Sequence, residues 1–325
     1  MTIRIGLLGC GEHSEIGHAV PLARYASTHS GAITLAAACD LRRERAELFH
    51  QKYGFGKAYL EMNEMLANEK LDVCISVVPV DLISNIGAAL LEAKILCVVE
   101  KPLGASIDQA RKLLQASLDT GTPNMVSVNR RFMPLLTRGM KWAQEAGPLH
   151  YLRATMLRHA RTESDFLQTT AIHAIDTVRF IAGDFAALNI RTLNQTSPHW
   201  YGIDIQFKNG ILGRIDVLPT AGMVEETYEL IGDGFRCIIT SPFGPQRLLR
   251  CYRKSELVLE EVGDKSTPED VIFGFYAEAA ELIAALSEGR PARPSIEEIF
   301  PSVQAGFVLA EHIAGSEKSR VLPKS

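Results

Sequence analysis

The chain has 325 residues, of which 46% are apolar, enough to form two separate hydrophobic cores. A formal net charge of −4 and the lack of a basic run argue against a nucleic-acid groove and against a charged membrane surface. No stretch approaches the roughly eighteen uninterrupted apolar residues that a membrane-spanning helix requires. We therefore expect small molecules as partners, with no nucleic acid and no membrane.

Six cysteines are scattered along the chain without the paired spacing that is typical of zinc ligands. Four of them lie in or beside apolar runs, where cysteine behaves as a small buried hydrophobe. Too few apolar residues precede Cys10 to form the apolar region of a secretory signal. We expect reduced cysteines, no bound metal and a cytoplasmic protein.

The first part of the chain alternates short apolar runs with amphipathic stretches, which is the pattern of βαβ units around a parallel sheet. Strands are predicted at 3–8, 33–39, 71–77 and 95–99. Helices are predicted at 18–27, 42–53, 82–93 and 107–120, the last of them ended by Gly121. This order predicts a Rossmann domain over residues 1–123.

From about residue 124 strand-like segments follow one another. Strands are predicted at 125–128, 149–158, 188–192, 203–207, 212–218, 226–232 and 235–240, and helices at 134–146, 170–182, 276–286 and 302–314. Asn209-Gly210 predicts a hairpin turn between two of the strands. Residues 124–325 should therefore form an α+β domain with an open, mostly antiparallel sheet. We expect its last helices to lie beside this sheet or to return toward the first domain.

The segment Gly9-Cys10-Gly11 follows the first predicted strand and precedes a helix, the context in which two such glycines predict a dinucleotide-binding turn. Gly9 permits the tight turn, and Gly11 lets the backbone approach a pyrophosphate. Ser14 is small enough to replace the absent third glycine, and Gly17 indicates a loop about one residue longer than usual. An ordinary glycine turn is the alternative.

Asp40 ends the second predicted strand, where a carboxylate accepts the ribose hydroxyls of adenosine and repels a 2′-phosphate. Its position supports the dinucleotide reading and favours NAD over NADP. Arg42 and Arg43 follow directly, and either side chain could turn inward and pair with a 2′-phosphate, so NADP stays open.

Lys101 stands where the apolar run 95–99 ends, just before Pro102, which has no backbone N–H to continue a strand. Ligands of an open parallel sheet bind outside the carboxyl ends of its strands, so this ammonium would point into the crevice. A lysine whose pKa is lowered by burial or by a nearby positive charge can exchange a proton near neutral pH. Lys101 is therefore a candidate proton-transfer residue, and a solvated loop lysine is the alternative.

His173 and Asp176 lie three residues apart in a predicted helix and should share one face. The carboxylate could orient the imidazole or bind substrate hydroxyls itself. The apolar residues that would anchor this helix are Ile172, Ile175, Val178 and Phe180. A core histidine and a solvated aspartate are the alternatives.

Five segments resemble, in order and spacing, the glucose–fructose oxidoreductase, inositol dehydrogenase and MocA family (Gfo/Idh/MocA). They are Gly9-Cys10-Gly11, Ala38-Cys39-Asp40, Glu100-Lys101-Pro102-Leu103, Val128-Asn129-Arg130-Arg131-Phe132 and Ile172-His173-Ala174-Ile175-Asp176. The resemblance covers nearly the whole chain. It implies an N-terminal Rossmann domain, a C-terminal open-faced sheet, and NAD(P)-dependent hydride transfer with a sugar, cyclitol or related polyol.

The resemblance also implies roles for individual residues. Lys101 would contact the reacting hydroxyl, His173 would serve as acid or base, and Arg130 would contact substrate. Glu100 and Pro79 would belong to the cofactor pocket, whose wall the apolar Val80 and Ile83 make less polar than usual. In the family such open sheets often pair, which implies a homo-dimer or homo-tetramer.

Two places depart from the family pattern: the segment after Pro79, which lacks the asparagine and histidine that commonly follow this proline, and position 169. Many catalytic members carry an aspartate four residues before the histidine, and here Thr169 stands there. Threonine can hydrogen-bond substrate but cannot act as a base near pH 7. Two alternatives to a dehydrogenase therefore stay open: a glycosidase that retains NAD and cleaves by transient oxidation and elimination, and a non-catalytic dinucleotide-binding regulator.

Overall fold

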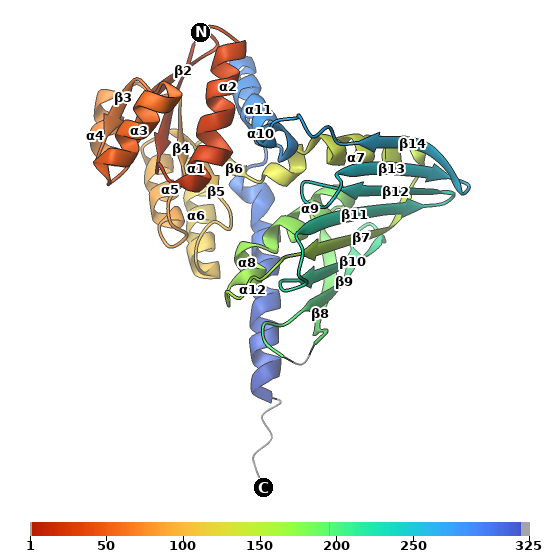
Figure 1. Ribbon diagram of the computed structural model, residues 1–325. Coiled ribbons are helices and arrows are strands. Elements are labelled where there is room, and N and C mark those ends of the chain that lie inside the picture. Colours follow the sequence, from red (N-terminus) through yellow and green to blue (C-terminus); the bar gives the residue numbers. More distant parts are fainter. Residues whose placement is uncertain (1, 195, 320–325) are drawn as a thin grey trace. The chain divides into compact units, whose positions relative to one another are not determined.

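The computed structural model describes residues 2–194 and 196–319, and this part of the chain divides into two compact units. The first comprises the residues up to Asn129 together with Glu269–Phe300, and the second comprises Arg130–Pro268 and the residues from Pro301 onward. The first unit thus takes in a C-terminal stretch as well as the N-terminal one (Figure 1).

The first unit is built on six parallel strands in the order β3-β2-β1-β4-β5-β6. The strands are β1 (Ile3–Leu8), β2 (Ile33–Cys39), β3 (Lys57–Tyr59), β4 (Val73–Ser76), β5 (Leu96–Glu100) and β6 (Asn124–Ser127). Most of their side chains are buried, as expected of a parallel sheet covered on both faces. The strand order reverses between β1 and β4, which is where such a sheet binds ligands.

Helices flank this sheet. They are α1 (Glu12–Ser14), the π-helix η1 (Glu15–Ala19), α2 (Val20–Thr28), α3 (Arg43–Tyr53), α4 (Met62–Asn68), α5 (Ile83–Glu92), α6 (Ile107–Thr120), α10 (Glu269–Ile272) and α11 (Phe275–Glu288). Helices α2 and α11 pack together beside β1, whereas α5 and α6 pack on each other beside β4 and β5. Right-handed crossovers put the two groups on opposite faces. The predicted Rossmann architecture is confirmed.

The second unit holds an eight-stranded sheet in the order β14-β13-β12-β11-β7-β10-β9-β8. The strands are β7 (Leu149–Leu157), β8 (Phe185–Thr192), β9 (Tyr201–Phe207), β10 (Leu212–Leu218), β11 (Glu225–Gly232), β12 (Phe235–Thr240), β13 (Leu248–Arg253) and β14 (Glu256–Val262). Every neighbouring pair is antiparallel except β7 with β10. The predicted turn at Asn209-Gly210 joins β9 to β10, with Gly210 at a φ of 89°.

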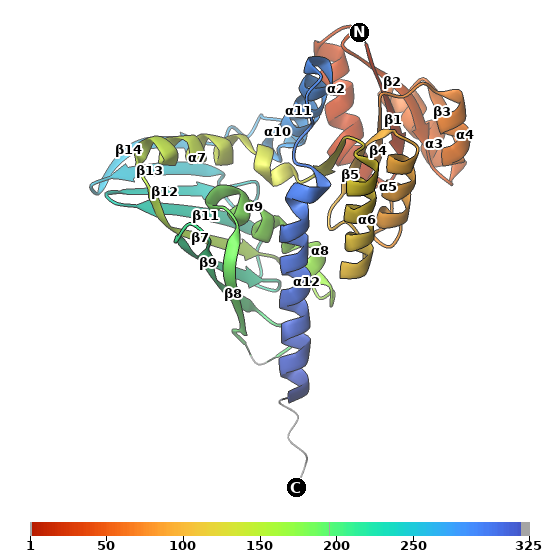
Figure 2. The same cartoon turned by 180° about the vertical axis from the view of Figure 1, so that it is seen from behind.

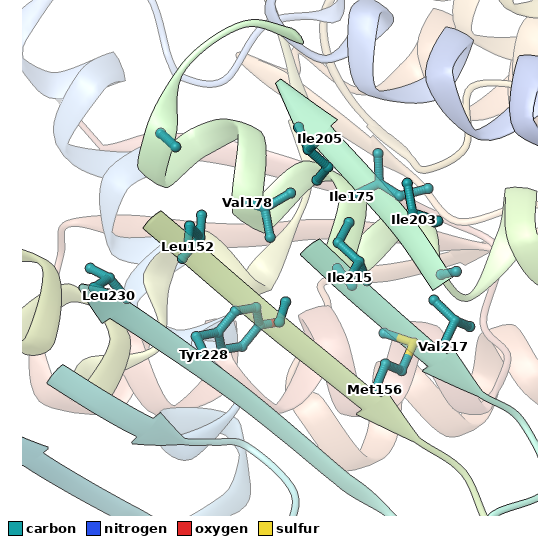
Figure 3. Packing of buried hydrophobic residues seen from close by; sticks show 14 of the residues in the cluster. Leu152, Met156, Ile175, Val178, Ile203, Ile205, Ile215, Val217, Tyr228 and Leu230 are labelled. Atoms are coloured by element: carbon teal, nitrogen blue, oxygen red, sulfur yellow. The ribbon is translucent and has the colours of Figure 1, made fainter. Parts of the chain in front are cut away.

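One face of this sheet carries the core of the second unit. The helical segments here are η2 (Asn129–Phe132), α7 (Pro134–Ala146), α8 (Phe166–Thr169), α9 (Ile172–Ala182) and α12 (Ile296–Ser319), and α12 contains the division between the units. Seen from behind in Figure 2, α7 lies along β12 and β13. Figure 3 shows Ile175 and Val178 of α9 beside apolar side chains of β7, β9, β10 and β11.

The predicted anchoring of α9 is right at three positions and wrong at the fourth. Ile172, Ile175 and Val178 are each 1% exposed, but Phe180 is 40% exposed. Phe180 follows Val178 by two residues, so on a helix its side chain points about 200° away from that face. The Arg131 guanidinium lies 4.8 Å from the centre of the Phe180 ring.

All six cysteines are buried and free. Within residues 2–194 and 196–319, no helix combines the length and the apolar character needed to cross a bilayer.

Candidate active site

A pocket of about 640 Å³ opens at the carboxyl ends of β1, β2, β4 and β5 in the first unit. It lies at the point where the strand order reverses. All eight residues predicted to bind the cofactor line it, namely Gly9, Gly11, Ser14, Asp40, Arg42, Pro79, Glu100 and Lys101. Four loops that are far apart in the sequence therefore converge on one cavity.

The loop after β1 needs its two glycines for different reasons. Gly9 has a φ of 88°, and a Cβ there would lie 2.0 Å from the carbonyl oxygen of Val77. No other residue fits that position without a backbone shift. A Cβ on Gly11 would meet nothing within 4 Å, and Gly11 lines the pocket. Glycine at position 11 therefore keeps the backbone open to a ligand.

Ser14 supplies a test of whether this pocket suits a phosphate group. Its side chain is buried and lines the pocket, and its hydroxyl oxygen has no hydrogen-bond partner within the described structure. Burial removes the hydrogen bonds that water makes with an exposed hydroxyl, so a buried hydroxyl without a partner is unfavourable. A phosphate oxygen would accept its proton, so Ser14 and the open backbone at Gly11 fit the pyrophosphate of a dinucleotide.

Asp40 connects two of the pocket loops. Its Oδ2 accepts a hydrogen bond of 2.8 Å from the Cys10 backbone N–H, and its Oδ1 accepts one of 2.9 Å from the Arg42 backbone N–H. Each carboxylate oxygen has further acceptor capacity, so ribose hydroxyls can still bind. The exposed side chains of Arg42 and Arg45 line the same end of the pocket.

Glu100, the last residue of β5, is held between two histidines. His18 Nε2 lies 2.9 Å and His13 Nε2 lies 3.3 Å from the same Glu100 oxygen, Oε1. Although burial opposes its ionisation, the two histidines hold the pKa of Glu100 well below its usual range. Sequence reasoning missed both histidines, and their nearness to the glycine loop was the available signal.

A second buried carboxyl group lies near this cluster. Burial, and then the charge of Glu100, raises the pKa of Glu278 on α11 to about 8. Ser127 Oγ and the Val128 backbone N–H donate hydrogen bonds of 3.0 and 2.7 Å to Glu278. Glu278 is therefore harder to ionise than an ordinary glutamate.

Lys101 follows β5 directly and is half-buried at the pocket. The strand ends at Glu100, one residue later than predicted, and Pro102 comes after the lysine. Lys101 therefore occupies the position predicted for it at the carboxyl end of a central strand.

His173 and Asp176 belong to the second unit, where α9 carries both. Asp176 is 2% exposed, and Arg131 binds both of its carboxylate oxygens at 2.8 and 2.7 Å. Ser302 donates a further hydrogen bond of 2.8 Å to Asp176 Oδ1. Sequence reasoning missed both partners of Asp176, because Arg131 and Ser302 are distant from it along the chain. The role of Asp176 toward His173 or substrate stays a prediction.

Arg130 is also part of a buried ion cluster. Its guanidinium donates two hydrogen bonds of 3.0 Å to Glu226, which also accepts one from Arg158. Phe243 packs its ring against both guanidiniums, with 5.4 and 5.1 Å from guanidinium carbon to ring centre. Sequence reasoning missed the buried partner of Arg130, which is Glu226. The substrate contact of Arg130 stays a prediction.

Thr169 lies at the end of α8, and its hydroxyl donates a 2.9 Å hydrogen bond to the Asp165 carbonyl. Where many family members have an aspartate, four residues before the histidine, this chain therefore has a half-buried hydroxyl.

Comparison with known proteins agrees with this geometry. Residues 3–129 match the family model GFO_IDH_MocA, described as an oxidoreductase family with an NAD-binding Rossmann fold. The myo-inositol 2-dehydrogenase of Thermotoga maritima is 26% identical over 66% of this chain and 68% of its own length. The first curated relatives are matched over 61% to 69% of their own lengths.

Solved structures resemble the chain over almost its full length. A dehydrogenase from Chromobacterium violaceum has a TM-score of 0.86 at 16% identity and covers 98% of both chains. A levoglucosan dehydrogenase in complex with NADH has a TM-score of 0.79 at 20% identity, covering 97% of this chain and 98% of its own. At these identities the likeness establishes the fold. The match to the GFO_IDH_MocA model covers the Rossmann part, residues 3–129, and the structural likeness extends over both units.

Proposed function

We propose that this protein is a dehydrogenase that transfers a hydride between a nicotinamide dinucleotide and a CH–OH carbon of a sugar, cyclitol or related polyol. One observation carries the proposal: the phosphate loop, Asp40 and Lys101 line a single pocket at the switch point of the sheet. The relative named a myo-inositol 2-dehydrogenase and the levoglucosan dehydrogenase bound to NADH support this substrate class.

Each proposed residue has a stated task. When bound, the nicotinamide supplies the hydride acceptor or donor. Lys101 exchanges a proton with the reacting hydroxyl, which must lose its proton as its carbon loses a hydride. His173 acts as the partner acid or base, and Asp176 orients it or binds a substrate hydroxyl. Arg130 and Thr169 are proposed substrate contacts.

The same pocket supports NAD over NADP. The Asp40 carboxylate would repel a 2′-phosphate, whereas the exposed Arg42 and Arg45 could attract one. We expect wild-type protein to bind NADH more tightly than NADPH. Asp40→Ser should shift the ratio of dissociation constants toward NADPH by about tenfold, because it removes the like charge. Fluorescence titration with both dinucleotides measures this ratio.

The control for this titration is Asp108→Ser, an exposed aspartate on α6 that does not line the pocket. It should leave the ratio unchanged. Tighter binding of NADPH than of NADH by the wild type would contradict the assignment.

We also propose a homo-oligomer that covers the outer face of the second unit's sheet. On this face, opposite the helices, charged side chains of neighbouring strands pair across the sheet. The pairs are Arg153–Asp216, Arg214–Asp204, Arg236–Glu229 and Arg250–Glu260. A second copy related by a two-fold axis would present the same surface of positive and negative side chains, so the two surfaces could pair. Sedimentation should show a species larger than the 35.7 kDa chain, and a monomer at all concentrations would contradict this.

The experiment that tests the dehydrogenase proposal is a panel of sugars, cyclitols and polyols, followed by the nicotinamide absorbance. Net reduction of added NAD with one of them is the expected result. Release of an aglycone from a glycoside without net reduction would instead favour the redox-elimination glycosidase, and bound dinucleotide that never reacts would favour the regulator.

A further inference from the structure

We propose that His13 is a cofactor-binding residue: its imidazolium, fixed by Glu100, faces the phosphate groups of the dinucleotide, so that dinucleotide binding takes up a proton. This inference rests on the proposed dinucleotide binding. His13 lines the pocket directly before Ser14, and 53% of its side chain is exposed. Its Nε2 lies 3.3 Å from Glu100 Oε1.

The π-helix explains how two histidines reach one carboxylate oxygen. In an α-helix, residues five apart point about 140° away from each other. The segment between His13 and His18 includes the π-helix η1, whose wider turn brings residues five apart toward the same side. His18, at 6% exposure, holds Glu100 from the interior, while His13 holds it from the pocket. The segment around Gly17, where the sequence predicted a longer loop, is helical, and its wider turn lets both histidines reach Glu100.

A positive charge on His13 would offset the negative charge in this loop. A pyrophosphate brings negative charge to a segment that already contains Glu12 and Glu15. Glu15 is neutralised by Lys52, which lies 2.6 Å from its Oε1, whereas Glu12 lines the pocket. From residue 9 to residue 14, His13 is the side chain that can carry a positive charge. The unpartnered hydroxyl of Ser14 next to it indicates that the same place accepts a ligand oxygen.

Other titratable groups face the His13–Glu100 pair and must be separated from it. They are Glu12 on α1, His18 on η1, Lys101 after β5 and, beyond Glu100, Glu278 on α11. Burial, and then the charge of Glu100, holds the pKa of Glu278 above its usual range. All of these groups remain in a His13 variant, in which Glu100 keeps its contact with His18.

The experiment is an NADH titration of the full chain between pH 5.5 and 8.5. For wild type we expect affinity to fall as pH rises through the histidine range. His13→Gln should bind NADH about tenfold more weakly at pH 6 and within about twofold of wild type at pH 8.5, because it lacks a charge-assisted hydrogen bond. Calorimetry in two buffers of different ionisation enthalpy should show proton uptake on binding in wild type and less uptake in the variant.

Two further variants serve as controls for this titration. His13→Lys keeps a cation that does not titrate in this range, so it should bind NADH more tightly than wild type at pH 8.5 and flatten the pH dependence. His150→Gln replaces an exposed histidine of the second unit and should behave as wild type.

Equal NADH affinity and equal proton uptake in wild type and His13→Gln would overturn the role of His13 while leaving dinucleotide binding in place. Failure of the wild type to bind NADH at any pH would overturn the proposed function together with this inference.

Discussion

Lys101→Met is expected to slow the chemical step by about 10²–10⁴-fold, the usual contribution of a general acid or base. The substitution keeps the apolar stem of the side chain and removes the ammonium group, which we propose exchanges the proton. Lys101 lines the pocket after β5, and the phosphate loop after β1 is unchanged in this variant, so NADH affinity should change by less than about threefold. Single-turnover kinetics followed by nicotinamide absorbance, with NADH titration alongside, measures both quantities.

The matched control is Lys112→Met on α6, where the ammonium binds the exposed Asn85 away from the pocket. It should leave both rate and affinity unchanged.

His173→Gln should slow the chemical step as Lys101→Met does. A rate for Lys101→Met within about threefold of wild type would contradict the assigned role of Lys101.

Glu226→Gln is expected to lower the free energy of unfolding of the second unit by about 3–5 kcal/mol. Glu226 is fully buried, and the guanidiniums of Arg130 and Arg158 both bind it. Removing its charge leaves two buried cations without a counter-charge. Both tryptophans, Trp142 and Trp200, lie in this unit, so urea unfolding followed by tryptophan fluorescence reports on it.

The pH dependence of this effect has a definite sign. Although burial opposes ionisation, Arg130 and then Arg158 hold the pKa of Glu226 below its usual range. A carboxylate with a depressed pKa stabilises the folded state above the unfolded-state pKa of about 4.3, and this stabilisation is lost as pH falls toward the folded-state value. The difference between wild type and Glu226→Gln should therefore be constant near pH 7 and shrink below about pH 4.

Glu229→Gln is the control on the same strand. Glu229 lies on the opposite face of β11 and pairs with the half-exposed Arg236, so its loss should cost about 1 kcal/mol or less. Equal effects of the two substitutions would contradict the distinction between the buried cluster and the outer face.

The fold was predictable where apolar periodicity is strong. The central strands β1, β2, β4 and β5 are mainly apolar, and α7 occupies the predicted range. The strands β3, β13 and β14 were missed. β3 and β14 are edge strands, whose partly solvated sequences lack a buried pattern. β13 lies inside the sheet but has only two buried side chains, those of Leu249 and Cys251. The helix α4 was missed for lack of a clear apolar period over seven residues.

The residues of the candidate site were predictable only where they belong to a local sequence motif. The glycine loop, Asp40 and Lys101 each stand at the end of a strand that the sequence reveals, and parallel strands bring such ends together. The partners of these motifs come from long-range contacts: Glu226 lies 96 residues from Arg130, and Asp176 lies 45 residues from Arg131. No local pattern in a single sequence encodes such pairings.

The central claim is that the pocket at the switch point holds a dinucleotide that reacts with a polyol. The direct test is NADH titration of the purified protein by fluorescence, followed on the same sample by the substrate panel at the nicotinamide absorbance. Saturable NADH binding, and substrate-dependent reduction of NAD, is the predicted result. Absence of saturable binding of both NADH and NADPH would contradict it.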